Sequence, residues 1–192
     1  MKKLNQWIDR FAYSHPRFGI PNLMLYIVIA NAATYILTMF AGSEALSFLE
    51  FDLYHLLHGE VWRLVTFVLL PFSYRPFSLF IMLSFYYFVG GTLEREWGTA
   101  KFTLYYLSGM ILSVLSTVIL SLATGYYGWS LSDAYYINLT MFLAYAALYP
   151  DAQIWFYMVI PLKAKWIAWA DIALFGWNIF RSLTYGAYGS AL

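Results

Sequence analysis

The two motifs that decide the fold are Gly59-Glu60-Val61-Trp62-Arg63-Leu64-Val65-Thr66 and Gly91-Thr92-Leu93-Glu94-Arg95-Glu96-Trp97-Gly98. They bracket one hydrophobic span, Pro76–Leu93, which contains no charged residue. A helix needs about 20 predominantly apolar residues to cross the hydrocarbon core of a bilayer, with a working range of about 17–25. The sequence therefore predicts a membrane-spanning helix with a conspicuous polar motif near each end.

The composition of the whole chain is that of a membrane protein. Hydrophobic residues make up 62% of its 192 residues and charged residues 11%, against about 45–50% and about 25% in soluble domains. The net charge of +1 provides no basic surface for nucleic acid. The absence of cysteine excludes disulfides, cysteine-ligated zinc, iron–sulfur clusters and thiol catalysis. We expect an integral membrane protein in contact with the lipid bilayer, without a cofactor.

Further uncharged stretches predict further membrane-spanning helices. With Pro76–Leu93 the candidates are Phe18–Ser43, Phe102–Ser132, Ala134–Pro150 and the weaker Trp166–Phe180, which Asp171 interrupts. No internal repeat or linker divides the chain, so residues 1–192 are expected to form a single domain. The predicted fold is an all-α, polytopic membrane helix bundle with about five spans.

The distribution of lysine and arginine predicts how these spans are oriented, because cytoplasmic loops are enriched in both. If the N-terminus lies in the cytoplasm, eight of the eleven basic residues fall inside and three fall outside. The inner set is Lys2, Lys3, Arg10, Arg17, Arg95, Lys101, Lys163 and Lys165; the outer set is Arg63, Arg75 and Arg181. We expect a multi-pass protein of the bacterial plasma membrane with a cytoplasmic N-terminus.

Two apolar segments are not predicted to cross the membrane. Ala152–Leu162 is too short, so we expect it to lie in the cytoplasmic interface or to re-enter the membrane there. Residues 43–75 mix apolar and charged side chains in an amphipathic pattern. This first loop is expected to be embedded in the outer leaflet as short helices.

The order of the motifs resembles that of the rhomboid family of intramembrane serine proteases. A Trp-Arg-Leu-x-Thr segment, Trp62–Thr66, stands in the first loop, and the next span closes on Gly-x-x-x-Glu-x-x-x-Gly, Gly90–Gly98. The resemblance covers roughly Trp62 to Trp166. It implies a rhomboid-like bundle with a membrane-embedded first loop.

The resemblance also implies a set of structural binding residues, which are Trp62, Arg63, Glu94, Trp97 and Gly98. Arginine has five N–H donors and can bind the backbone carbonyl groups of a loop that lipid cannot hydrate. Glu94 could cap loop amides or pair with Arg95 or Lys101. The alternative for Glu94 is an ordinary charge at the membrane interface.

The catalytic residues of a rhomboid protease are missing from this sequence. Alignment on Pro150 places the family's Gly-x-Ser-Gly over residues 133–136, so Tyr135 stands at the nucleophile position. Alignment on Glu94 places the oxyanion-binding His and Asn over Ser78 and Met82.

A general base is missing as well, because no histidine follows His58. A serine nucleophile requires such a base within hydrogen-bonding distance. Ser130 lies five residues too early to replace the nucleophile, and Lys163 and Lys165 are expected on the opposite face of the membrane. We therefore predict no catalytic residues.

Other candidate sites have simpler interpretations. His55-x-x-His58, near Asp52 and Glu60, has the residue types of a metal site, but histidines three apart are more typical of the polar edge of an amphipathic helix, so we predict no metal. Asp171 is expected near the interface rather than in a proton relay. Asn138 and Thr140 are expected to form interhelical hydrogen bonds.

The predicted function is that of a catalytically inactive rhomboid relative, a pseudoprotease that binds transmembrane segments of partner proteins. The alternative is a rhomboid intramembrane serine protease whose missing sixth helix lies outside this chain, beyond Leu192. A third possibility, a small transporter subunit, would require a polar stripe through several spans.

Overall fold

The computed structural model describes residue 10, residues 13–14 and residues 18–42, 44–71, 73–127, 134–156 and 160–184. The chain groups into two compact units, Met1–Leu139 and Thr140–Leu192. The boundary falls within helix α8 (Ala134–Leu148), so the first turns of α8 belong to the first unit.

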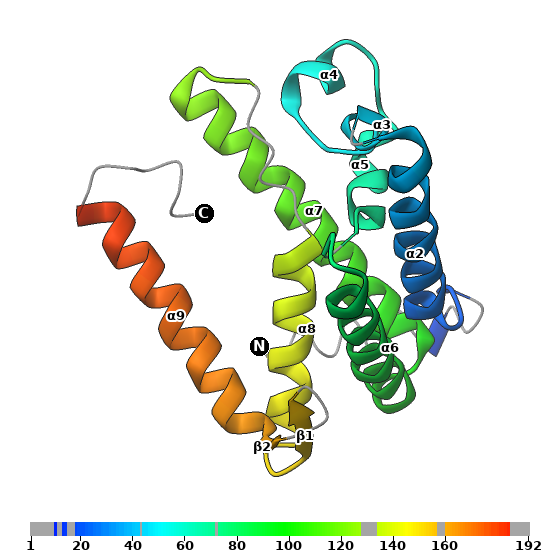
Figure 1. Ribbon diagram of the computed structural model, residues 1–192, viewed down its shortest axis with the longest axis vertical. Helices are drawn as coiled ribbons and strands as arrows, with labels where there is room; N and C mark the ends of the chain where they lie inside the picture. Colours follow the sequence, from blue (N-terminus) through cyan, green and yellow to red (C-terminus); the bar gives the residue numbers. More distant parts are fainter. Residues whose placement is uncertain are drawn as a thin grey trace. The chain divides into compact units, whose positions relative to one another are not determined.

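Three long helices form the main part of the first unit (Figure 1): α2 (Leu23–Ala41), α6 (Pro76–Trp97) and α7 (Thr99–Thr124). Among the described residues, these are the helices that are long and apolar enough to cross a membrane, and α8 is a shorter apolar helix. The prediction of a membrane helix bundle is confirmed.

The ends of α6 and α7 follow from local backbone chemistry. Pro76 begins α6, where its missing N–H costs no hydrogen bond. Gly98 and Gly125 end α6 and α7 with positive φ angles of 83° and 69°, a conformation that favours glycine. The sequence predicted ends at Leu93 and Ser132. The true ends differ because helix formers extend α6 by a turn and because Gly125 stops α7 early.

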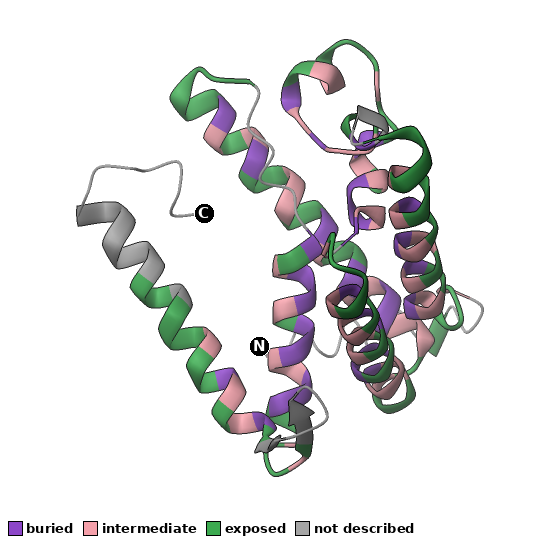
Figure 2. Cartoon of the chain, in the orientation of Figure 1, coloured by how far each residue is buried: buried purple, intermediate pink, exposed green. Residues whose placement is uncertain are grey.

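The first loop contains short helices, as the sequence predicted. They are α3 (Glu44–Ser47), α4 (Leu53–Leu57), α5 (Arg63–Thr66) and the 3-10 helix η1 (Phe67–Leu69). Phe51 and Phe67 are completely buried, and Leu53 is nearly so. Figure 2 shows buried stretches within α4 and α5. Burial of these apolar side chains stabilises the first loop, in which charged residues stand between the apolar ones.

Small residues allow the helices of the first unit to pack closely. A Cβ atom on Gly90 of α6 would lie 2.6 Å from Cγ of Met24 on α2. A Cβ atom on Gly109 of α7 would lie 3.2 Å from Cγ2 of Ile137 on α8. Small residues are typical of such contacts in membranes, where backbones approach each other without a hydrophobic driving force.

The second unit contains a β-hairpin, which the sequence pattern did not predict. Strands β1 (Gln153–Phe156) and β2 (Ile160–Lys163) are antiparallel, with Gln153 opposite Lys163 and Phe156 opposite Ile160. The β-branched and aromatic residues of β1 favour a strand. Pro161 is tolerated because both strands of a two-stranded sheet are edge strands.

Helix α9 (Ala164–Thr184) follows the hairpin. Its 21 residues are enough to cross a membrane. It is not among the described helices that are both long enough and apolar enough to cross a membrane. A fifth span here remains a prediction, and Asp171 lies partly buried in this helix.

Candidate functional site

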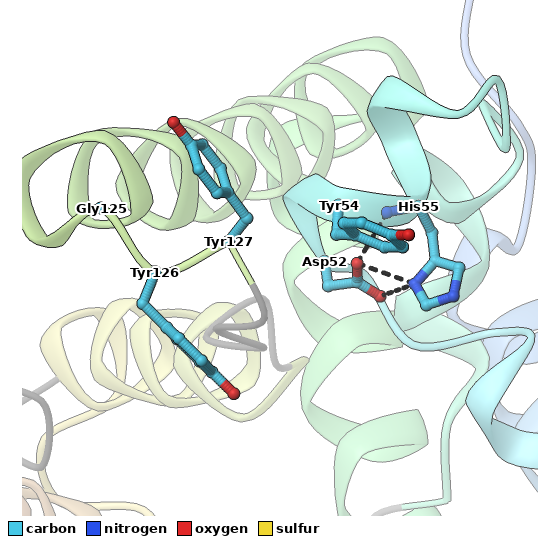
Figure 3. Close-up of a pocket in the computed structure, with 6 residues that line it drawn as sticks. All are labelled: Asp52, Tyr54, His55, Gly125, Tyr126 and Tyr127. Atoms are coloured by element: carbon cyan, nitrogen blue, oxygen red, sulfur yellow. Dashed lines mark hydrogen bonds and ion pairs between the residues drawn. The ribbon is translucent and has the colours of Figure 1, made fainter.

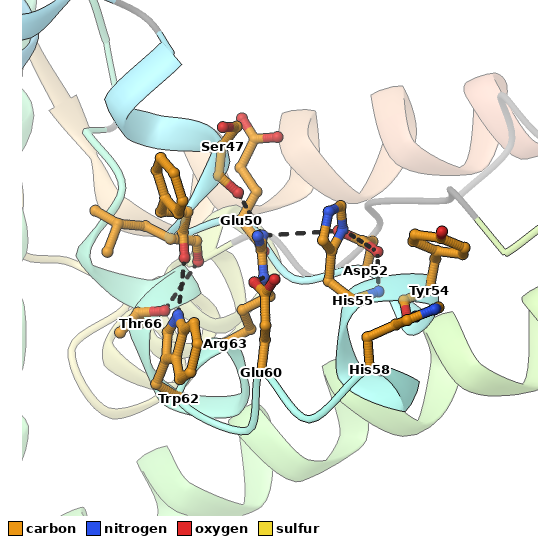
Figure 4. Close-up of polar contacts among 12 residues, drawn as sticks. Ser47, Glu50, Asp52, Tyr54, His55, His58, Glu60, Trp62, Arg63 and Thr66 are labelled. Carbon is orange, nitrogen blue, oxygen red and sulfur yellow. Dashed lines mark hydrogen bonds and ion pairs between the residues drawn. The ribbon is translucent and has the colours of Figure 1, made fainter.

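Arg63 is the most heavily bonded side chain of the first loop (Figure 4). It is only 2% exposed. Its Nη1 donates to the carbonyl oxygen of Ser47 and, at 2.6 Å, to that of Glu50. Its Nε donates to Oε2 of Glu60 at 2.6 Å, and Oδ2 of Asp52 lies 3.7 Å from Nη1. One guanidinium thus joins segments that precede and follow α4.

Two neighbours of Arg63 complete the same arrangement. The indole Nε1 of Trp62 donates to the carbonyl oxygen of Phe48 at 3.2 Å, and Oγ1 of Thr66 donates to that of Leu49 at 3.0 Å. The motif therefore supplies a donor to each of the four successive carbonyl groups of residues 47–50. We call these contacts the Arg63 clamp.

The clamp provides hydrogen-bond donors for carbonyl groups at the end of the short helix α3. Helix α3 has four residues, and the last carbonyl groups of a helix have no partner within it. Buried carbonyl groups without partners cost about 1–3 kcal/mol each. The role of Thr66 was not recognised from the sequence, although Thr66 stands in the quoted motif.

Asp52 and His55 lie beside the clamp. Asp52 caps α4, since its Oδ1 accepts from the backbone N–H of His55 at 2.8 Å. The ring Nδ1 of His55 also donates to Oδ2 of Asp52 at 2.7 Å, and that of His58 donates to the carbonyl oxygen of Tyr54 at 2.8 Å. Each histidine therefore bonds within its own helical turn, as expected for a polar helix edge.

A pocket of about 490 Å³ opens next to this pair (Figure 3). Asp52, Tyr54 and His55 line one side of it, and Gly125, Tyr126 and Tyr127 line the other. The backbone N–H of Tyr54 donates to the carbonyl oxygen of Tyr127 at 3.2 Å. The first loop is thereby attached to the segment that follows α7.

Glu94 lies in the last turn of α6, where three helices of the first unit meet. Its Oε1 accepts from the backbone N–H of Asn22 at 2.9 Å and from Oγ1 of Thr99 at 3.1 Å. These bonds join the start of α2 to the start of α7, and we call them the Glu94 junction. The contact with Asn22 is the loop-amide capping that was one of the alternatives for Glu94.

The other two predicted frame residues lie close to this junction. The backbone N–H of Gly98 donates to the carbonyl oxygen of Glu94, and Gly98 then leads directly into α7. Trp97 packs edge-on against Tyr105, with ring centroids 5.3 Å apart. Gly98 therefore makes the sharp turn between two long helices.

Tyr135, at the expected nucleophile position, lies in the first turn of α8 and is 49% exposed. The contact between Ile137 and Gly109 fixes the level of that turn. Gly109 is ten residues beyond the start of the 26-residue α7, or about 15 Å along a helix of about 39 Å. Helix α8 therefore begins near the middle of α7 rather than level with its end.

The remaining catalytic positions are less informative. Ser78 and Met82 lie in the first two turns of α6 and are partly buried. Ser130 and Asp133 lie outside the described residues.

The hydrogen bonds of the buried asparagine side chains differ from those predicted. Both amide atoms of Asn138 are buried and have no hydrogen-bond partner in the described structure, so the predicted interhelical bond of Asn138 is wrong. Asn31 on α2 makes such a link instead, because its Nδ2 donates to the carbonyl oxygens of Ile27 and Val68 at 3.0 Å. An amide within an uncharged span was the sequence signal that could have identified Asn31.

A family model described as "Eukaryotic integral membrane protein (DUF1751)" matches residues 22–189, which is most of the chain. The chain belongs to this family. No curated protein and no solved structure is a significant match.

Family membership corrects one prediction and supports another. The family is eukaryotic, so the prediction of a bacterial plasma membrane is wrong. The lysine and arginine distribution that was used to orient the spans carries no information about the organism. The prediction of an integral membrane protein is confirmed.

Proposed function

We propose that this protein is a rhomboid-like pseudoprotease, which binds transmembrane segments of other membrane proteins without cleaving them. The observation that carries the proposal is the start of α8. The turn that would present a rhomboid nucleophile begins near the middle of α7, and it presents Tyr135. The Arg63 clamp and the Glu94 junction support a rhomboid-like frame because their residues belong to the two motifs that resemble that family.

The absence of the catalytic residues of a rhomboid protease supports an inactive relative of that family. Tyrosine replaces the nucleophile at Tyr135, and the chain has no histidine after His58 to act as a base. The phenol of Tyr135 lies on a half-exposed side chain. A phenol without a histidine base is a poor substitute for the activated serine of a serine protease.

The dimensions of α8 support the binding of transmembrane segments. Its 15 residues span about 22 Å, which is less than the hydrocarbon core of about 30 Å. A short helix favours local thinning of the bilayer, and a thinned region favours short transmembrane partners.

The free surface for such a partner lies on the second half of α7. Leu115, Ile119 and Leu122 are exposed there and follow the i, i+4, i+7 spacing of one helix face. Because α8 begins near Gly109, this half of α7 extends beyond the start of α8. We propose this face as the contact surface.

Photo-crosslinking tests the proposal. A photoreactive amino acid replaces Ile119 in the full chain, and the protein is reconstituted with tagged Ala/Leu transmembrane segments of 17 or 24 residues. We expect the 17-residue segment to crosslink several-fold more than the 24-residue segment. The matched control places the same group at Ile36, an exposed residue of α2. Equal crosslinking at both positions, or no preference for the short segment, would refute the proposal.

We also propose that the N-terminus and the Glu94 junction face the cytoplasm, with the Arg63 clamp on the opposite side. The charge distribution supports this orientation. The absence of cysteine permits a clean test with single cysteines at Lys101 and Tyr54. A membrane-impermeant maleimide added to sealed vesicles should label one of the two cysteines and not the other. Labelling of both from the same side would exclude the proposed placement of the Glu94 junction and the Arg63 clamp on opposite sides of the membrane.

A further inference from the structure

Three buried polar side chains of the first unit carry hydrogen-bonding atoms that have no partner among the described residues. They are Asn31 on α2, with its Oδ1, Tyr106 on α7, with its hydroxyl, and Asn138 on α8, with both atoms of its amide. Asn31 and Asn138 are completely buried, and Tyr106 is 1% exposed. Buried polar atoms normally bond either to protein groups or to ordered water.

Asn31 and Tyr106 lie at nearly the same depth in the bundle. The Glu94 junction brings the start of α2 and the start of α7 together. Asn31 is eight residues beyond the start of α2, and Tyr106 is seven residues beyond the start of α7. These separations correspond to about 12 Å and about 11 Å along the two helices. Because both side chains are buried, they point into the interior of the first unit at one level.

Asn138 approaches the same level from a third helix. Its neighbour Ile137 contacts Gly109, since a Cβ atom on Gly109 would lie 3.2 Å from Cγ2 of Ile137. Gly109 is three residues beyond Tyr106 and therefore lies on the same side of α7. The turn of α8 that carries Asn138 thus packs beside the turn of α7 that carries Tyr106.

The chemistry of these groups favours water as their common partner. All three side chains are uncharged, so they provide no counter-ion for a buried charge. Together they offer hydrogen-bond donors as well as acceptors. A buried water molecule typically makes about three hydrogen bonds to polar groups that otherwise lack partners. One side chain from each of α2, α7 and α8 supplies about that number.

We propose that Asn31, Tyr106 and Asn138 bind an ordered water molecule inside the bundle. The hydroxyl of Tyr106 and the amide of Asn138 bond to it from α7 and α8, and Oδ1 of Asn31 accepts a hydrogen bond from it on α2. The water links three apolar helices at a depth where lipid offers no hydrogen bonds. The site is independent of the proposed binding of transmembrane partners, because it lies inside the bundle and not on the exposed face of α7.

Hydroxyl-radical footprinting of the full chain in detergent tests for the water directly. X-ray pulses convert bound water into hydroxyl radicals, which oxidise the side chains that the water contacts. After correction for the reactivity of each ring, Tyr106 should be oxidised several-fold faster than Phe102, a completely buried residue one turn away on α7. Asn138→Leu should reduce the oxidation of Tyr106 to the level of Phe102. Equal oxidation of Tyr106 and Phe102 in the native protein, or no change in Asn138→Leu, would overturn the proposal.

A double-mutant cycle tests whether Tyr106 and Asn138 share the water. Tyr106→Phe and Asn138→Leu should each lower the equilibrium constant for folding about 3- to 10-fold. The double variant should lose little more than either single variant, because the first change already removes the water. Thr117→Val is the matched control, since this buried hydroxyl of α7 donates to the carbonyl oxygen of Ser113 in its own helix. Its effect should add to that of Asn138→Leu, and additive effects of Tyr106→Phe and Asn138→Leu would overturn the proposal.

Discussion

Arg63 and Glu94 each join segments that are far apart in the sequence, but they do so in different surroundings. Arg63 is buried and bonds to two carbonyl groups and a carboxylate. Glu94 is partly exposed and accepts two hydrogen bonds, from an amide and a hydroxyl. Water can replace a partner at Glu94 and cannot readily do so at Arg63. Hydrogen bonds that play a similar part in joining segments therefore contribute differently to the free energy of unfolding, because their burial differs.

Replacement of Arg63 should have the largest effect. Arg63→Ala leaves the carbonyl groups of Ser47 and Glu50 and the carboxylate of Glu60 without their partner, and breaking a buried pair costs about 3–5 kcal/mol. Arg63→Lys should recover part of this loss, because one ammonium cannot reach all of the acceptors in the fork geometry of a guanidinium. Denaturant unfolding in detergent measures the change, with the exposed Arg75→Ala as the control. An equal effect of Arg63→Ala and Arg75→Ala would show that the clamp contributes little.

The second prediction tests the close packing of α6 against α2. Gly90→Ala places a Cβ atom 2.6 Å from Cγ of Met24 and should destabilise the protein by about 1–3 kcal/mol. Gly91→Ala is the matched control, since the nearest atom to its Cβ lies 4.0 Å away. Gly91→Ala should be neutral or stabilising by up to about 1 kcal/mol, because alanine favours helix. Thermal unfolding of the pair in one detergent is the measurement, and equal behaviour of the two variants contradicts the close packing of α2 and α6.

Glu94 itself should contribute less than Arg63. Glu94→Gln keeps an acceptor for Asn22 and Thr99 and should cost less than about 1 kcal/mol, whereas Glu94→Ala should cost about 1–2 kcal/mol. Hydrogen exchange at the amide of Asn22 reports the lost bond directly, because that N–H would be left to water. A loss at Glu94→Ala as large as at Arg63→Ala would remove the contrast between the two regions.

The smallest effect is expected in the second unit, at an exposed cluster. Hydrogen bonds from Lys165 and Lys163, together with their positive charges, lower the pKa of Asp151 below its ordinary value of 3.8. A lowered pKa in the folded state means that Asp151 stabilises the hairpin above its ordinary pKa, and that this contribution disappears as the pH falls through the lowered value. Hydrogen exchange of the hairpin amides should therefore show protection that decreases on acidification below about pH 4. Asp151→Asn should abolish that pH dependence, and an unchanged pH dependence in this variant would assign it to another group.

The sequence predicted the features that depend on composition along the chain. Uncharged length located α2, α6 and α7, and the amphipathic pattern of the first loop indicated short helices. The donor capacity of Arg63 suggested bonds to backbone carbonyl groups, although not which four carbonyl groups the clamp would reach. That choice depends on how α3 folds back against α5, which no local pattern encodes.

The features that the sequence did not predict depend on contacts between distant residues. The β-hairpin is too short to produce a periodic pattern, and its aromatic residues also suit a membrane interface. The level at which α8 starts depends on the contact between Gly109 and Ile137. Asn31 finds its partner at Val68, in the first loop, whereas Asn138 is buried without one. Hydropathy identifies apolar segments but not which faces pack together.

The most direct test of the central claim, a rhomboid-like frame without protease chemistry, is a combined activity measurement on the full chain. The purified protein is incubated with a fluorophosphonate probe for activated serines and, separately, with a generic rhomboid substrate. We expect neither labelling nor cleavage with the native protein or with Tyr135→Ser, because no histidine follows His58 to activate the new hydroxyl. Labelling or cleavage by the native protein that disappears in Ser130→Ala would show that the protein is an active serine protease.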